Sequence, residues 1–369
     1  MQGVYIHIPF CMQKCRYCDF VSYCGREDIH EKYIEALGRE MAQHHGIEAD
    51  TIFIGGGTPT VLAPPLLEKL LFLVRENFRL TDNVEYSMEA NPKTLSPEKL
   101  HILKAGGVNR LSIGVQSFYD DELRTLGRIH SAEDAYNTVW MAKNAGFENI
   151  NLDLMSALPE QTLGKFRHTL EQAVGLEPAH ISCYSLILEE GTPLAADYKK
   201  GRFQIPDEDT DRAMYDYACE YLTSKGYTQY EISNFAKSGY PCRHNLKYWE
   251  CREYIGIGVA AHSYDGAIRR ENTTVLADYL DGQGIGDIEA VLTAEDKTSE
   301  FMILGLRKTN GISEQEFFQK FGTGIDNIYG KELKKFIKGG FLYRQNGRIF
   351  LSQKGISVSN GVMCEFILK

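Results

Sequence analysis

The chain has 369 residues, of which 43% are hydrophobic and 24% are charged, with 34 glycines and 11 prolines. This composition is typical of a soluble globular protein and excludes collagen-like, intrinsically disordered and disulfide-dense small folds. The formal net charge of −10 disfavours a general attraction to nucleic-acid backbones. Because the sequence shows neither a membrane-length apolar run nor a signal peptide before its first predicted strand, we expect a cytoplasmic protein.

Short β-rich runs alternate with amphipathic helical patterns along the first two thirds of the chain. The predicted strands are 4–8, 51–54, 84–88, 110–114, 149–153 and 180–184. The predicted helices are 28–46, 65–76, 96–105, 131–145, 162–175 and 207–225. Six βα units in series predict an α/β fold with a parallel sheet and right-handed crossovers, either an open sheet or part of a barrel.

Polar or glycine residues follow almost every predicted strand. For the first five strands these are Cys11, the run Gly55-Gly56-Gly57-Thr58, Glu89, Gln116 and Asp153. In parallel α/β folds the functional residues lie at the carboxyl ends of the strands. We therefore expect these side chains to gather on one face of the sheet.

The βα alternation stops near residue 230. Residues 234–264 are rich in Tyr, Cys, His and Gly and predict an irregular, functional connection. Residues 294–351 predict two helices followed by a hairpin whose turn is Asn346-Gly347. We divide the chain into a core (1–232), a connecting segment (233–290) and a small winged-helix-like α+β domain (291–369).

Nine cysteines, an odd number, argue against a disulfide framework. Four of them, Cys11, Cys15, Cys18 and Cys24, lie within the first 24 residues, which indicates ligation. A C-x3-C-x2-C loop directly after a strand can place three thiolates around a four-iron cluster and leave one iron open. The alternatives are a structural zinc completed by His7 or Cys24, and Cys24 as a fourth cluster ligand.

This loop, with Tyr17 before the third cysteine, resembles the signature of the radical S-adenosylmethionine (SAM) superfamily. The resemblance extends over nearly the whole chain, through YIHIPFC at 5–11, GGGTPT at 55–60, EANP at 89–92, GVQSF at 114–118, Asp153 with Leu158-Pro159, and EFMILGL at 300–306. Together these motifs resemble the branch that contains oxygen-independent coproporphyrinogen III dehydrogenase and the HemW haem chaperones. The resemblance implies a partial (β/α)6 TIM-like radical SAM barrel.

The resemblance also implies the cofactor sites. Cys11, Cys15 and Cys18 would ligate a [4Fe-4S] cluster whose open iron binds SAM. The residues placed around SAM are Tyr5, Tyr17, Gly56, Gly57, Thr58, Glu89, Gln116, Arg128 and Asp153. Glycines permit close backbone approach, and carboxylates suit an ammonium group or ribose hydroxyls.

Two departures separate this chain from the dehydrogenase pattern. That enzyme has a further cysteine two residues beyond the third, where this chain has Phe20, and a substantial segment before its cluster motif. Conversely, residues 244–249 fit the H-N-x-x-Y-W motif associated with the haem chaperones. His244 is the resulting candidate for the axial haem ligand, and Cys242 and Cys251 are alternative thiolate ligands.

We therefore expect a haem chaperone that binds haem and transfers it to acceptor haemoproteins, respiratory ones among them. The cluster and exchangeable SAM would then be structural or regulatory. The alternatives are oxygen-independent coproporphyrinogen III dehydrogenase and a radical SAM enzyme that modifies nucleic acid, which the net charge disfavours. No nucleic-acid partner is expected, while a homodimer and transient contact with a membrane protein stay open.

Overall fold

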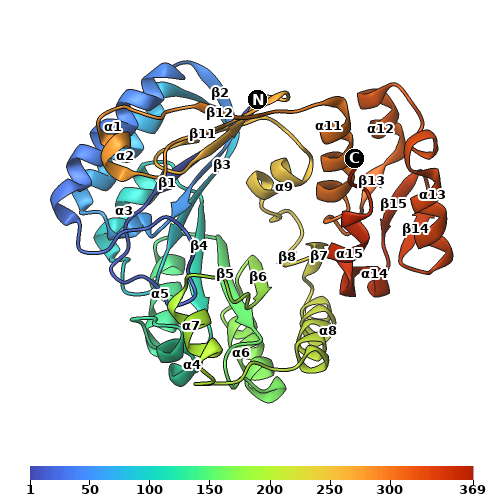
Figure 1. The fold of residues 1–369 in the computed structure, drawn as a ribbon. Coiled ribbons are helices and arrows are strands. Elements are labelled where there is room, and N and C mark those ends of the chain that lie inside the picture. The colour runs from blue at the N-terminus through green and yellow to red at the C-terminus, as the bar shows by residue number, and fades with distance from the viewer. Residues whose placement is uncertain (369) are drawn as a thin grey trace.

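A computed structural model describes residues 1–368 and confirms the predicted parallel α/β core (Figure 1). Its six central strands follow one another in chain order, and each is parallel to the next. They are β1 (Gln2–Ile8), β2 (Ile47–Gly56), β3 (Phe78–Ala90), β4 (Arg110–Gln116), β5 (Asn149–Ser156) and β6 (His180–Ser185). The carboxyl ends of these strands therefore share one edge of the sheet.

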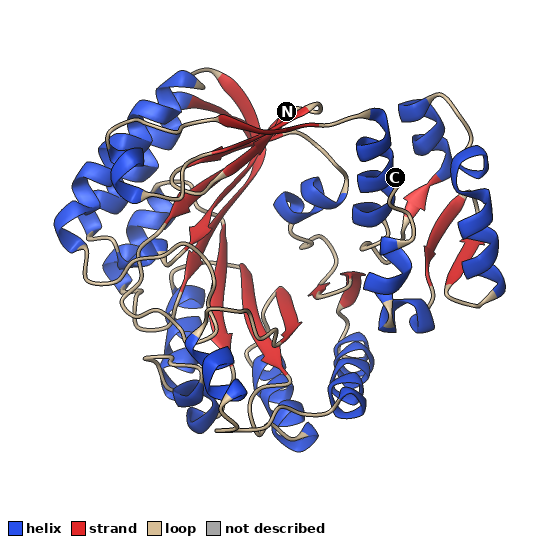
Figure 2. Ribbon diagram, viewed as in Figure 1, coloured by secondary structure: helices blue, strands red, loops and turns tan. Residues whose placement is uncertain are grey.

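Helices cover the outer face of the curved sheet (Figure 2). The helices of the core are α1 (His30–Gln43), α2 (Pro64–Asn77), α3 (Pro97–Ala105), α4 (Asp120–Thr125), α5 (Ala132–Asn144), α6 (Leu163–Gly175), α7 (Pro193–Lys199) and α8 (Glu208–Ser224), with 3-10 turns η1 (Glu27–Ile29) and η2 (Pro59–Val61). Side chains cap the predicted starts: Ser96 accepts from the Lys99 N–H, and Ser131 forms a capping box with Asp134. Among the described residues, no helix is long and apolar enough to cross a membrane.

The segment after residue 227 contains more regular structure than its composition predicts. On one edge β7 (Thr228–Glu231) and β8 (Asn234–Ala236) extend the sheet beyond β6. The other edge gains β9 (Tyr254–Ile257), β10 (His262–Tyr264), β11 (Ile268–Glu271) and β12 (Asp287–Val291), with α9 (Arg243–Trp249) and α10 (Leu276–Leu280) between strands. Because β9 pairs in parallel with β1, the sheet is continued at that edge and does not close on β6.

The C-terminal part has its own three-stranded sheet and a separate apolar core. Its elements are α11 (Ala294–Gly305), β13 (Ile312–Ser313), α12 (Glu314–Phe321), α13 (Ile325–Lys338), β14 (Leu342–Gln345), β15 (Arg348–Leu351), α14 (Gln353–Ser357) and α15 (Ser359–Cys364). Three helices precede the hairpin instead of the predicted two, because left-handed Gly322 ends α12. The predicted turn is confirmed, since Asn346 and Gly347 have φ of 51° and 70°.

Candidate functional site

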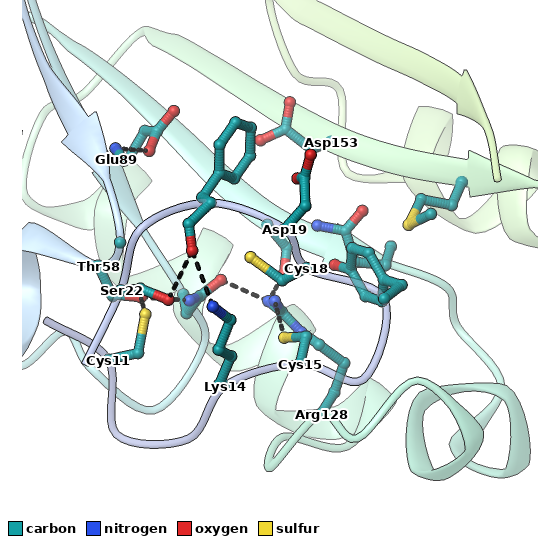
Figure 3. Close-up of a pocket in the computed structure, with 18 of the residues that line it drawn as sticks. Cys11, Lys14, Cys15, Cys18, Asp19, Ser22, Thr58, Glu89, Arg128 and Asp153 are labelled. Carbon is teal, nitrogen blue, oxygen red and sulfur yellow. Dashed lines mark hydrogen bonds between the residues drawn. The ribbon is translucent and has the colours of Figure 1, made fainter. Parts of the chain in front are cut away.

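A cavity of about 530 Å³ opens at the carboxyl ends of the parallel strands (Figure 3). The three cysteines of the C-x3-C-x2-C loop line it, as do eight of the nine residues expected around SAM. These eight are Tyr17, Gly56, Gly57, Thr58, Glu89, Gln116, Arg128 and Asp153. The fold therefore brings together residues that are up to 142 positions apart in sequence, from Cys11 to Asp153.

The cysteine loop is anchored to the turn that follows α4. The Arg16 N–H donates to the Leu126 carbonyl over 2.9 Å, and Gln13 Nε2 donates to the Gly127 carbonyl over 2.9 Å. The Arg16 guanidinium also forms an ion pair with Asp197 of α7. These contacts fix a loop that has no helix or strand of its own between Cys11 and Cys18.

The thiols of this loop meet hydrogen-bond donors that suit thiolates. Arg128 Nη1 lies 3.3 Å from Cys15 Sγ, and Thr58 Oγ1 lies 3.7 Å from Cys11 Sγ. Burial raises the pKa of the Cys11 thiol to about 11, so a positive group is needed to hold that sulfur ionised. Three thiols facing one cavity beside cationic Arg128 fit a cluster held by three cysteines.

The zinc alternatives fit less well. Both ring nitrogens of His7 are engaged, Nδ1 with the Tyr5 hydroxyl at 2.9 Å and Nε2 with the Val21 carbonyl at 3.0 Å. Cys24 is exposed and is not among the residues that line the cavity. Within residues 1–368, no three His, Cys, Asp or Glu side chains are arranged to hold a single metal ion.

Close packing requires the run of glycines 55–57 at the end of β2. A Cβ on Gly56 would lie 2.3 Å from the His7 ring, and one on Gly57 would lie 2.7 Å from the Ile8 and Phe10 carbonyl oxygens. Gly56 also has a φ of 100°, a conformation that other residues rarely adopt. The run therefore lets the end of β2 approach β1 while its backbone lines the cavity.

Two carboxylates form the deep wall of the cavity. Glu89 accepts a hydrogen bond from the Gly56 N–H over 2.9 Å, and burial together with nearby Asp153 raises its pKa to about 7. Asp153 accepts from Ser112 Oγ and Asn151 Nδ2 at 3.1 and 2.8 Å. These groups can accept hydrogen bonds from a ligand that carries N–H or O–H groups.

Arg128 links the cysteine loop to the strand ends. Besides Cys15, it donates to Asn91 Oδ1 and to the Gly114 carbonyl oxygen. Gln116, two residues after Gly114, has a φ of 67° and is 9% exposed at the cavity wall. Because its guanidinium donates to Cys15, Asn91 and Gly114, Arg128 belongs to this site and is not a free surface cation.

Tyr5 lies one layer deeper than expected. It lines a second cavity of about 220 Å³ on the concave side of the sheet, which shares Glu89, Ser112, Asp153 and Tyr184 with the first. Its hydroxyl contacts His7 rather than the main cavity. Tyr5 therefore supports the floor of the predicted SAM site from below.

His244 also lines the second cavity, where both its ring nitrogens are hydrogen-bonded. Nδ1 lies 2.9 Å from Thr51 Oγ1 and Nε2 lies 2.9 Å from the Tyr248 hydroxyl. The side chain is 1% exposed, and burial lowers its pKa to about 3. In this conformation His244 is a neutral bridge between β2 and α9 and has no ring nitrogen free for iron.

The rest of the H-N-x-x-Y-W motif divides between two environments. Tyr248 lines the second cavity with His244. The Trp249 ring instead lies under the Arg307 guanidinium, whose Cζ is 4.3 Å from the centroid of the ring. Cys242 is fully buried and donates to Glu85 over 3.6 Å. Cys251 packs against the core of the C-terminal part. The motif thus connects barrel and C-terminal part in this structure.

The chain is similar to known protein families and to curated relatives over nearly its whole length. Residues 5–173 match the radical SAM superfamily and residues 292–358 match the HemN C-terminal domain. "Heme chaperone HemW" of Bacillus subtilis (strain 168) is 40% identical over 100% of this chain and 99% of that protein. The chain belongs to the HemW family. The Escherichia coli (strain K12) protein of the same name is 37% identical over 95% of this chain and 96% of its own length.

A solved structure confirms the fold of this HemW-family chain. It is coproporphyrinogen III oxidase (HemN) from Escherichia coli, which superposes with a TM-score of 0.86 over 99% of this chain and 90% of that one, at 25% sequence identity. The radical SAM barrel and the small C-terminal domain are therefore both shared with that enzyme.

Several polar residues of the main cavity were not predicted from the sequence, among them Asn91, Ser112 and Tyr184. Asn91 donates to Thr58 Oγ1 over 2.7 Å and accepts from Arg128. Ser112 orients Asp153, and Tyr184 stands between the two cavities. Asn91 directly follows β3 and Tyr184 is the penultimate residue of β6, so the strand-end rule could have found these two, whereas Ser112 lies in the first half of β4.

Proposed function

We propose that this protein binds haem and delivers it to acceptor haemoproteins in the cytoplasm. The observation that carries the proposal is 37–40% identity, over nearly the full chain, to proteins named "Heme chaperone HemW". Phe20 supports it, because the chain lacks the additional cysteine of the dehydrogenase loop at that position. Respiratory haemoproteins are the acceptors that we would examine first.

The second part of the proposal concerns the cofactors. Cys11, Cys15 and Cys18 would hold a [4Fe-4S] cluster, which when bound would supply an open iron for SAM to chelate and, once reduced, an electron. Gly56 and Gly57 would let the ligand approach the backbone, and Glu89 and Asp153 would accept its N–H and O–H groups. Arg128 would keep the loop and Cys15 in place.

A second candidate function is oxygen-independent coproporphyrinogen III dehydrogenase. The observation that favours it is the TM-score of 0.86 to coproporphyrinogen III oxidase from Escherichia coli. The candidate predicts SAM-dependent formation of protoporphyrinogen by the reduced, cluster-loaded protein. Absence of turnover in a preparation with full cluster content would reject it.

The test is an anaerobic haem titration of the cluster-reconstituted protein, followed through the Soret band. Saturable binding near one haem per chain, and transfer of that haem to an apo-haemoprotein, would support the proposal. Absence of specific binding would reject it.

His244→Gln is the matched variant for the haem ligand. Glutamine preserves hydrogen-bonding groups for Thr51 and Tyr248 but is not a haem ligand. Weaker binding in this variant would make His244 the axial ligand and would require α9 to move away from the position seen here. Unchanged binding would remove His244 from the haem site.

A further inference from the structure

Two large apolar side chains stand at the mouth of the main cavity. Phe20, from the cysteine loop, is 62% exposed, and Ile187, from the loop between β6 and α7, is 69% exposed. Both line the cavity whose deep wall carries Glu89 and Asp153. Apolar side chains gathered at the entrance to a polar cavity are typical of a binding site rather than of scattered surface residues.

The loop that carries Ile187 is held in place by its neighbours. Leu186 and Leu188 pack into a small apolar cluster with Leu194 and Tyr17, and the Leu186 N–H donates to the Ser156 carbonyl over 3.0 Å. The residues on either side are thus anchored inward while Ile187 between them stays exposed. This arrangement presents an apolar side chain at low conformational cost to a ligand.

The Phe20 side of the mouth is held by a cation. Lys14 Nζ donates to the Phe20 backbone carbonyl oxygen over 2.9 Å, so an ammonium group lies beside the backbone of Phe20. Asp19 and Glu189 line the same cavity, in addition to Glu89 and Asp153 of its deep wall. The mouth therefore offers apolar contacts from two loops, with one cation close to Phe20.

We propose that the haem macrocycle binds across this mouth, between Phe20 and Ile187, above the predicted SAM site. The inference rests on the proposed haem-binding function and assigns a position to the ligand. The apolar faces of the disc would contact Phe20 and Ile187, one propionate would approach Lys14, and the other would point to solvent away from Asp19 and Glu189. Haem in this position covers the route by which SAM enters and leaves.

Zinc protoporphyrin IX is the ligand for the test, because the proposed contacts involve the macrocycle and not the iron. Its fluorescence is titrated with cluster-reconstituted wild type, Phe20→Ser and Ile187→Ser. Each substitution should weaken binding about tenfold, as expected for loss of one buried apolar side chain. Phe72→Ser is the matched control, since Phe72 is 53% exposed on α2 and does not line the cavity.

A second readout follows release of labelled SAM from the same preparations. Haem should slow SAM release from wild type, and the effect should be lost in Ile187→Ser. Iron content is measured for each variant, because Phe20 lies two residues from Cys18.

The outcomes distinguish failure of the proposed haem position from failure of the proposed haem-binding function. Wild-type affinity in either mouth variant, at full iron content, overturns the proposed position and leaves the haem-binding function standing. Failure of wild type to bind haem or its zinc analogue overturns both. Weakened binding in both variants with an unchanged Phe72→Ser control supports the position.

Discussion

At the scale of single residues, Glu89 shows how the cavity sets the charge of a side chain. Burial raises its pKa to about 7, Asp153 adds to the rise, and the Gly56 N–H opposes it. In the unfolded chain the pKa of an ordinary glutamate is about 4.3. Between these two values the folded protein binds a proton that the unfolded chain has lost, so its stability falls as pH rises from about 4 to about 7.

Glu89→Gln should remove this dependence. Without ligands, the variant should be more stable than wild type at pH 8, by at most about 4 kcal/mol, and the gain should shrink as pH falls toward 5. Urea unfolding at both pH values measures the difference. Glu68→Gln, which changes an exposed carboxylate on α2, is the control. An equal gain at both pH values would show that Glu89 is not the titrating group.

At the scale of elements, the cysteine loop depends on the turn after α4. Gly127 in that turn has a φ of 74°, and a Cβ there would lie 2.8 Å from Arg16 Cγ. The same turn accepts hydrogen bonds from Arg16 and Gln13. A small displacement of the turn would therefore move the loop that carries Cys11, Cys15 and Cys18.

Gly127→Ala should therefore reduce cluster content as well as stability. Gly201→Ala is matched to it, because Gly201 has a φ of 67° but nothing within 4 Å of the added Cβ. Each substitution should cost about 1 to 2 kcal/mol through backbone strain. Only Gly127→Ala should lower the iron content after anaerobic reconstitution. Equal iron content in the two variants would mean that the turn does not position the loop.

At the scale of the whole molecule, local patterns predict the βα core and distant contacts decide the rest. The periodicity of six βα units, the caps at Ser96 and Ser131 and the turn at Asn346-Gly347 are all short-range signals, and the structure confirms them. His244 is different, since its partner Thr51 lies 193 residues away. The sequence motif selected this residue but could not show that its ring nitrogens are already engaged.

The strands added at the two edges were unpredictable for the same reason. β9 pairs with β1 across about 250 residues, and short strands without such partners cannot be told from loops. Likewise, Tyr5 and Glu89 both lie on central strands, and only the assembled sheet shows that Tyr5 faces the deeper cavity. The cysteine loop could be predicted because its three cysteines are close in sequence.

The contact between barrel and C-terminal part is centred on a buried charge. Glu231, at the end of β7, has a fully buried side chain, and Arg307, after α11, approaches it to 3.8 Å. Arg307 also lies over the Trp249 ring of α9, and its carbonyl accepts from the Ile232 N–H over 3.1 Å. Burial raises the pKa of Glu231, and Arg307 opposes that rise.

Arg307→Met should therefore destabilise the protein in a pH-dependent way. Without the guanidinium the pKa of Glu231 rises further, so the buried carboxylate costs more as pH rises and little when it is protonated. We expect a loss of about 2 kcal/mol at pH 8 and a smaller loss at pH 5.5. The midpoint of urea unfolding, followed by the fluorescence of the two tryptophans, of which Trp249 lies at this interface, measures it. Adding Glu231→Gln should restore only the pH-dependent part, because the contact with Trp249 stays lost. A loss that is the same at both pH values would show that packing on Trp249, and not the buried charge, joins the two parts.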